Sequence, residues 1–445
     1  MTAAQTIRIG AGAGFAGDRI EPAIELVEHG DLDYLVFECL AERTIALAQA
    51  AMLADPNKGY DPLLLERIRR VAPAAKERGV RIVTNAGAAN PLGAAHAVAE
   101  MVRQMGLAPL RVAAVLGDDV VETISTGVYP LLDHVGTSAD LPDMISANAY
   151  LGAGPIAEAF AQEADIVITG RVGDPALFIG PMIHAFGWSL EDMNLMGRAT
   201  VIGHLLECAG QLCGGYFADD VRKAVPNLAR LGFPLAEVSA DGSAVLTKVA
   251  GSGGRISTAT CKEQLLYEIL DPTAYQQADV IADFSTVRFE EIGPDRIAVS
   301  GGTGRAPSGT LKVSIGYDDG YIGEGQIAYA GPGAVARARL AADIVRERLT
   351  MIGIPVNDLT CEIVGVDAID RTGRAEAPRE VRARIVGRTA TRDAAERIGA
   401  EVEALYTNGP FGGGGVTRSV RRVVAVASTL IPAQTVSPRV VMVEA

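Results

Sequence analysis

The first 190 residues alternate short apolar runs with amphipathic stretches, and this rhythm leaves few folds open to the chain. The apolar runs read TIRIGAG, DYLVFE, RIVTNAG, LRVAAVLG and DIVITGR, and segments with helical periodicity lie between them. Strands that are apolar on both faces and alternate with helices are typical of a parallel sheet that is covered on both sides. The pattern therefore predicts an α/β fold with an N-terminal parallel sheet flanked by helices.

The helical periodicity predicts helices over residues 18–29, 44–53, 62–78, 91–105 and 154–162. In a parallel sheet of this kind, ligands bind beyond the carboxyl ends of the strands. We therefore expect the functional residues in the loops after Gly10, Phe37, Thr84, Leu116 and Thr169.

The pattern changes near Asp192, where strand-like segments become frequent and helices become few. Mixed β-structure of this kind predicts a C-terminal α+β lobe. Its expected helices cover residues 262–270, 334–349 and 393–405, and two apolar runs, RRVVAVASTL and RVVMVEA, close the chain. The predicted domains are residues 1–190, 191–355 and 356–445, and the last segment is either a separate small domain or a continuation of the second lobe.

Charge and cysteine content narrow the possible partners. The chain has 40 Lys plus Arg against 54 Asp plus Glu, so its net charge of −14 disfavours binding to nucleic acid or to an anionic membrane. No apolar stretch approaches the ~20 residues that cross a bilayer, and the N-terminus lacks the features of a signal peptide. The five cysteines form no CxxC pair, so we expect a cytoplasmic protein without disulfides.

A glycine-rich loop follows the first predicted strand. Gly12, Gly14 and Gly17 have the spacing of a dinucleotide-binding turn, and Glu38 ends the second strand about 20 residues later. Bare backbone at these glycines would let an anion approach a helix N-terminus. Asp18, however, is expected to cap that helix and to place a carboxylate where a phosphate would lie. The loop therefore predicts a site for a dinucleotide, for another anionic or acyl ligand, or only a tightly packed turn.

Glu38 is the first candidate for acid–base chemistry. A carboxylate at the end of an apolar strand is costly unless it is paired or used in function. The alternative is a glutamate that caps a helix or forms a salt bridge. Cys39 beside it is expected to be a small buried hydrophobic residue, because no histidine neighbours it in the sequence.

Polar residues also follow the third and fifth predicted strands. Asn85 and Asn90 lie in TNAGAANP, where their amides are suited to orienting a carbonyl or carboxylate, although Asn90 before Pro91 is equally typical of a helix cap. Arg171 and Asp174 lie in TGRVGDP, where the arginine is suited to clamping a carboxylate or phosphate. The alternative is a structural ion pair between Arg171 and Asp174.

His204 and Glu207 are three residues apart on a predicted helix, so they share one face and suit a proton relay or a metal pair. We predict no metal, since two further ligands would be needed and no second histidine cluster exists. Glycine clusters later in the chain lack the Gly-Lys-Ser/Thr of a P-loop, and no GxSxG motif of an α/β-hydrolase occurs.

Distinctive segments along the whole chain resemble the acyclic terpene utilisation (AtuA) family. These segments are IGAGAGFAGDR, DYLVFECLAE, TNAGAANP, ADIVITGRVGDPAL, GHLLECAGQLCGGYFAD, KEQLLYEILDP and ALYTNGPFGGGG. The family takes its name from gene clusters that degrade citronellol and geraniol through branched acyl-CoA thioesters. The resemblance implies catabolism of small branched acids or their CoA esters. It supplies no catalytic residues and no cofactor.

The resemblance also bears on partners. Some family members carry an additional small C-terminal domain that occurs in others as a separate polypeptide, and this sequence ends at Ala445 without it. We therefore expect a separate small subunit as a partner, together with self-association into a homo-oligomer.

Together these features favour a lyase of the hydratase or dehydratase type, acting on a small or branched carboxylic acid or its acyl-CoA thioester. Glu38 would be the base, and His204 with Glu207 the acid relay. Asn85 and glycine-loop amides would stabilise the enolate oxygen, while Arg171 would hold the carboxylate. The alternatives are an NAD(P)-dependent oxidoreductase and a non-catalytic scaffold subunit. The preferred hypothesis requires Glu38 and Arg171 to face one cavity.

Overall fold

The computed structural model describes residues 6–370, 372 and 378–444. It divides the chain into two units. One unit extends to Gly316 and resumes at Val426, and the other is Tyr317–Ala425.

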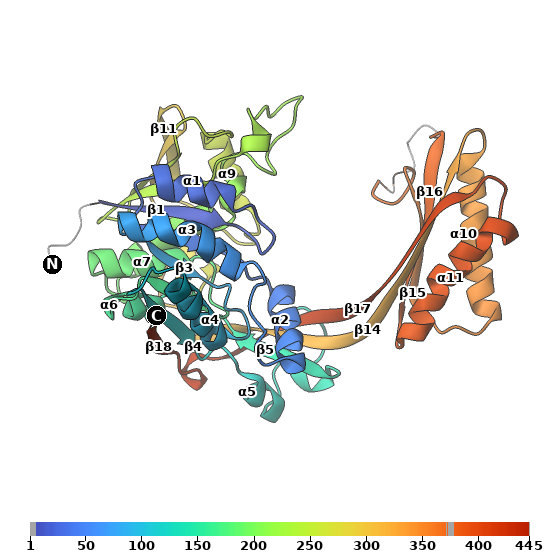
Figure 1. The fold of residues 1–445 in the computed structure, drawn as a ribbon, viewed down its shortest axis with the longest axis horizontal. Helices are drawn as coiled ribbons and strands as arrows, with labels where there is room; N and C mark the ends of the chain where they lie inside the picture. The colour runs from blue at the N-terminus through green and yellow to red at the C-terminus, as the bar shows by residue number, and fades with distance from the viewer. Residues whose placement is uncertain (1–5, 371, 373–377, 445) are drawn as a thin grey trace. The chain divides into compact units, whose positions relative to one another are not determined.

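Parallel strands form the centre of the first unit (Figure 1). They belong to a ten-stranded sheet and lie in the order β1 (Thr6–Ala13), β2 (Tyr34–Phe37), β3 (Arg81–Thr84), β6 (Ile166–Thr169) and β4 (Arg111–Leu116). Each neighbouring pair among them is parallel. Their residues are largely buried on both faces, which explains why the sequence shows continuous apolar runs instead of alternation. The predicted parallel sheet is confirmed.

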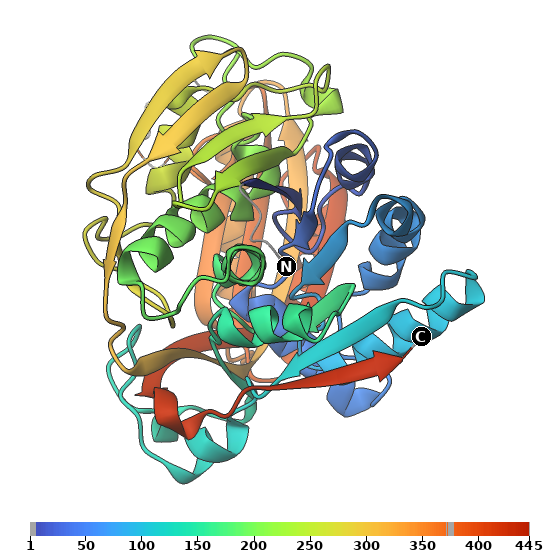
Figure 2. The same ribbon diagram turned by 90° about the vertical axis from the view of Figure 1, so that its left-hand side faces the viewer.

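Two helical layers cover this parallel centre. One row packs α1 (Glu21–His29), α3 (Leu64–Arg78) and α4 (Pro91–Gln104), and the other packs α6 (Gly154–Ala161), α7 (Ala176–Phe186) and α8 (Met193–Glu207). Figure 2 shows the first row, in blue to cyan, and the second, in green, on opposite sides of the strands. The remaining helices of this unit are α2 (Glu42–Ala54), α5 (Val121–Thr126) and α9 (Thr258–Leu266). The helical periodicities of the sequence thus correspond to real helices, with ends shifted by a few residues.

Antiparallel strands extend the sheet at both edges. Beyond β1 lie β7 (Pro234–Ser239), β8 (Ala244–Lys248), β12 (Arg296–Ser300) and β11 (Arg288–Gly293), and beyond β4 lies β18 (Arg439–Glu444). Across the predicted border between residues 190 and 191 the sheet is continuous, because β1 hydrogen-bonds to β7 along Thr6–Gly10 and both strands share one core. The closing run RVVMVEA, of which Ala445 lies outside the described residues, pairs with β4 in this same sheet.

Smaller elements complete the first unit. A three-stranded sheet orders β13 (Thr303–Arg305), β10 (Ile281–Asp283) and β9 (Tyr275–Gln276). Separately, β5 (Met144–Ala149) pairs with β14 (Thr310–Ala330). None of the described helices is both long and apolar enough to cross a membrane.

The second unit has the βαββαβ order of ferredoxin-like domains. Its elements are the part of β14 from Tyr317 onward, α10 (Ala334–Met351), β15 (Asn357–Val364), β16 (Glu380–Thr389), α11 (Arg392–Asn408) and the part of β17 (Gly414–Pro432) up to Ala425. The sheet order is β15-β16-β14-β17. The core contains Ile327, Val345, Ile385, Ile398 and Val402. Elements on both sides of the predicted border between residues 355 and 356 share this core, because α10 packs on β15 and β16.

Candidate functional site

A cavity of about 960 Å³ lies in the first unit, at the carboxyl ends of the parallel strands. Its wall includes the loop after β1, the loop after β2, the loop after β6 and the C-terminal end of α8. The acidic side chains in the wall are Asp18, Glu38, Glu42, Asp174, Glu207 and Glu268, and the basic ones are Arg19 and Arg171. Apolar and aromatic residues make up much of the rest, namely Phe15, Leu40, Tyr216, Leu228, Leu231, Phe233 and Tyr267.

The cavity brings together most of the residues singled out from the sequence. Gly14, Gly17, Glu38, Arg171, Asp174 and Glu207 line it. Gly12, Asn85, Asn90 and His204 do not line it, although Asn85 and His204 are bonded to residues that do. The requirement that Glu38 and Arg171 reach one cavity is met.

Glu38 is a buried carboxyl of this wall whose pKa is raised. It directly follows β2, only 8% of it is exposed, and its Oε1 accepts hydrogen bonds from the backbone N–H of Leu40 at 2.8 Å and from Nδ2 of Asn85 at 2.9 Å. Burial and the neighbouring Asp174 carboxylate raise the pKa of Glu38 to about 8, against the lowering influence of Arg171. At neutral pH this carboxyl therefore holds a proton.

Asn85 holds the Glu38 carboxyl in place through a hydrogen bond. It is fully buried at the end of β3, where its Nδ2 donates to Glu38 and its Oδ1 accepts from the backbone N–H of Cys39 at 2.7 Å. Its amide is thus engaged on both sides, so it orients Glu38 and does not point into the cavity as a donor.

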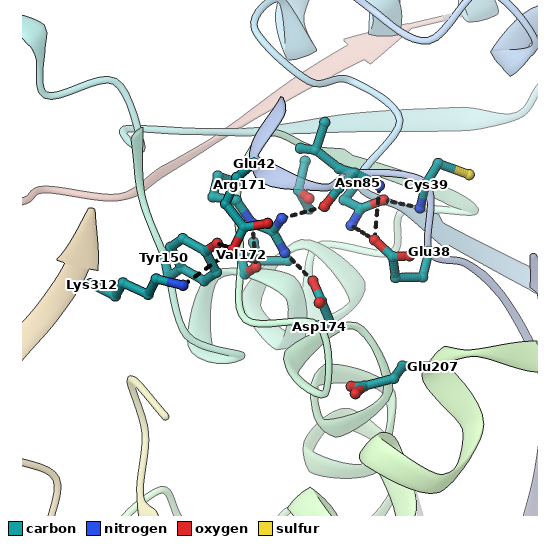
Figure 3. Close-up of polar contacts among 12 residues, drawn as sticks. Glu38, Cys39, Glu42, Asn85, Tyr150, Arg171, Val172, Asp174, Glu207 and Lys312 are labelled. Carbon is teal, nitrogen blue, oxygen red and sulfur yellow. Dashed lines mark hydrogen bonds and ion pairs between the residues drawn. The ribbon is translucent and has the colours of Figure 1, made fainter. Parts of the chain in front are cut away.

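Arg171 is too deeply buried, and too fully hydrogen-bonded, to bind the carboxylate of a ligand directly. Only 1% of it is exposed, and each guanidinium nitrogen has a protein partner: Nε donates to the carbonyl of Val172, one Nη to the carbonyl of Leu40 and the other to Asp174 (Figure 3). Its guanidinium carbon also lies 4.4 Å from the ring centre of Tyr150. The structural ion pair with Asp174 that the sequence left open is therefore present.

Tyr150 is a neighbour of Arg171 that the sequence did not reveal. Its ring lies between Arg171 and Lys312, whose Nζ is 5.0 Å from the ring centre, and its hydroxyl donates to Glu42 at 2.5 Å. Burial would raise the pKa of Glu42, but this hydrogen bond and Lys312 lower it to about 2. Glu42 is therefore ionised at neutral pH, in contrast to Glu38.

His204 and Glu207 form the predicted pair. They lie on the C-terminal part of α8, with Nδ1 of His204 2.7 Å from Oε1 of Glu207. The His204 ring packs against Tyr275 and Phe284. Burial lowers the pKa of His204, but the Glu207 carboxylate raises it overall. Burial raises the pKa of Glu207 to about 7 despite His204.

The glycine loop differs from a dinucleotide-binding turn. Gly12 lies inside β1, where an added Cβ would come within 2.8 Å of the Phe37 ring. Asp18 does not cap α1, whose N-cap is Ile20; instead its carboxylate accepts from the backbone N–H of Gly14 at 2.9 Å. The amide of Gly14 is therefore already bound to a carboxylate.

The remaining candidates from the sequence do not act in the cavity. Asn90 caps α4 by accepting from the backbone N–H of Gly93 at 3.0 Å. Among the described residues no group of three or more His, Cys, Asp or Glu side chains is arranged to hold a metal ion. Cys39 is buried, and burial raises the pKa of its thiol well above the usual value, so it is not an activated nucleophile.

Two further polar residues position the cavity wall. Arg67 on α3 is 1% exposed; it pairs with Asp61 at 2.9 Å and donates to the carbonyl of Ala16 in the glycine loop at 2.6 Å. Asp118, which follows β4, accepts from the backbone N–H of Arg171 at 2.8 Å. Arg67 occupies the apolar stripe of an amphipathic helix, between Leu64 and Val71, and a charge in such a stripe is a signal that sequence inspection can detect.

The fold and this cavity define an α/β protein with a carboxyl-rich cavity at the carboxyl edge of a parallel sheet. The model of the acyclic terpene utilisation family protein AtuA matches residues 7–442, and the chain therefore belongs to this family. Membership implies involvement in acyclic terpene catabolism. No curated protein and no solved structure matches the chain.

Proposed function

We propose that this protein is a hydro-lyase, a hydratase or dehydratase, that acts on a small or branched carboxylic acid or its acyl-CoA thioester. The observation that carries this proposal is the presence of two carboxyl groups with raised pKa values, Glu38 and Glu207, in the wall of one cavity. Carboxyl groups tuned to titrate near neutral pH are typical of acid–base catalysts.

The reaction needs one group that exchanges a proton with the α-carbon and another that exchanges a proton with water or the hydroxyl group. Glu38 holds a proton at neutral pH, whereas Glu207 is closer to ionisation and is bonded to His204. In the hydration direction Glu207 removes a proton from water as the oxygen bonds to the β-carbon, and Glu38 delivers a proton to the α-carbon. Dehydration runs the same steps in reverse, so Glu38 is then the base.

The neighbours of these carboxyls support the assignment. Asn85 holds Glu38 through a hydrogen bond of 2.9 Å, and His204 holds Glu207 through one of 2.7 Å, so both are positioning residues. Asp174 acts electrostatically on both carboxyls, because its carboxylate raises the pKa of Glu38 and also that of Glu207. The charge state of Asp174 therefore influences proton transfer at both carboxyls.

The pH dependence of kcat/KM tests the proposal. For hydration of a branched α,β-unsaturated acyl thioester, kcat/KM should rise as Glu207 ionises near pH 7 and fall as Glu38 loses its proton near pH 8. Stopped or continuous assays between pH 5 and about 10 would measure the profile. A profile without both limbs, or one that keeps its acidic limb in Glu207→Gln, would contradict the assignment.

A further inference from the structure

Carboxyl groups outnumber cations in the wall of the cavity. Six acidic side chains line it, against two arginines, and five of the six remain once Glu38, which is protonated at neutral pH, is set aside. The acidic groups come from separate elements, including the loop after β2, the loop after β6 and the end of α8. A second, smaller cavity of about 340 Å³ shares Glu42, Asp174 and Glu268 with the first, so the excess of carboxyls continues there.

The cations near the wall are already engaged or exposed. The guanidinium of Arg171 binds Asp174 and two backbone carbonyls, and only 1% of the residue is exposed. Lys312, which lines the second cavity, lies 3.2 Å from Glu42. Arg19 is an exposed residue and sits beside Asp18. A carboxylate ligand would thus find no free buried cation among these residues.

Glu207 gives independent evidence about what enters the cavity. Its Oε2 is buried and has no hydrogen-bond partner in the described part of the chain, although the residue itself lines the cavity. A buried carboxylate oxygen needs a donor, such as water or a ligand hydroxyl. A second carboxylate placed there would add like-charge repulsion in a poorly solvated site.

We propose that the cavity takes its substrate as an acyl derivative whose carbonyl group carries no charge, such as a thioester, and discriminates against the free carboxylate. The inference rests on the proposed function for the identity of the acyl group, and it selects one of the two substrate forms named there. In this account Arg171 is a structural cation that holds the loop after β6, and it does not bind the carboxylate of a substrate.

Binding of a matched pair of unreactive probes tests this proposal. N-methyl-3-methylbutanamide and 3-methylbutanoate share a carbon skeleton, and only the second is charged at pH 7.5. Calorimetric titration of the full chain should give an affinity for the amide at least about tenfold greater than for the acid, because like charges in the cavity oppose the carboxylate. Equal affinities, tighter binding of the acid, or no binding of the amide would overturn the proposal.

The same binding experiment on the Asp174→Asn variant gives a second test of the proposal. This substitution removes one negative charge and frees a guanidinium nitrogen of Arg171, so the preference for the amide should shrink by several-fold. Glu28→Gln is the matched control. It also removes one negative charge, but Glu28 is an exposed residue near the end of α1 that does not line the cavity, so the preference for the amide should stay unchanged. An unchanged preference in Asp174→Asn would also overturn the proposal. Binding requires no turnover, so a catalytic failure of Glu38 or Glu207 would refute the proposed reaction while leaving this charge preference measurable.

Discussion

Replacing Glu38 with Gln is expected to lower kcat for hydration or dehydration by about 10²–10⁴-fold, the usual contribution of a positioned acid or base. The glutamine amide is nearly isosteric and can still accept hydrogen bonds from Leu40 N–H and Asn85. It cannot exchange a proton with the substrate, so the loss should fall on kcat. Steady-state kinetics with a branched acyl thioester would measure it.

The fold should survive this substitution. Glu38 is mainly protonated at neutral pH, so a neutral amide replaces a neutral carboxyl and the melting temperature should stay close to that of the native chain. Glu77→Gln, an exposed position on α3, is the matched control and should change neither kcat nor melting. Full activity in Glu38→Gln, with an intact fold, would remove Glu38 from the mechanism.

Replacing Asp61 with Asn is expected to reduce the free energy of unfolding by about 3–5 kcal/mol, because removal of one partner leaves a buried charge uncompensated. Asp61 and Arg67 are 2% and 1% exposed in their side chains, and their charged atoms lie 2.9 Å apart. Denaturant unfolding followed by circular dichroism would measure the loss. Since Arg67 also holds the Ala16 carbonyl, ligand affinity should fall as well.

Two companion variants separate this effect from a general loss of charge. Glu66→Gln breaks an exposed pair with Arg69 on the same helix and should cost at most about 1 kcal/mol. The double variant Asp61→Asn with Arg67→Met removes both charges and should recover part of the lost stability. Equal effects of Asp61→Asn and Glu66→Gln would show that burial of the Asp61–Arg67 pair contributes nothing.

The parallel centre of the sheet could be predicted from the sequence because its signals are local. Runs such as DYLVFE and DIVITGR are apolar on both faces, and helical periodicity separates them, so β2 and β6 were expected almost where they lie. The rule that ligands bind at the carboxyl ends of parallel strands then located the cavity.

The sheet edges and the domain borders could not be predicted, because they depend on pairing between distant segments. Nothing local in RVVMVEA indicates that β18 pairs with β4, more than 300 residues earlier in the chain. Likewise β14 extends over 21 residues and β17 over 19, with exposed charged residues such as Arg418 interrupting the apolar pattern of β17. Tertiary pairing overrode the local composition there.

Several residues of the cavity wall could be singled out from the sequence, but the contacts between them could not. Glu38, Glu207 and Arg171 were recognisable because charged residues at strand and helix ends are costly unless they are used or paired. The direction of each side chain was not recognisable: Asn85 faces Glu38, and Arg171 faces Asp174 and backbone carbonyls. Tyr150 and Lys312 come from distant segments whose approach to Arg171 only the fold reveals.

The most direct test of the account is a crystal structure of the chain with N-methyl-3-methylbutanamide bound. The account predicts that the acyl group lies in the 960 Å³ cavity, with the Glu38 carboxyl within hydrogen-bonding reach of it, roughly 2.6–3.2 Å, and with Glu207 in contact with the same acyl group or with a water beside it. An acyl group bound elsewhere, or one that touches neither carboxyl, would contradict the claim that Glu38 and Glu207 act on one substrate.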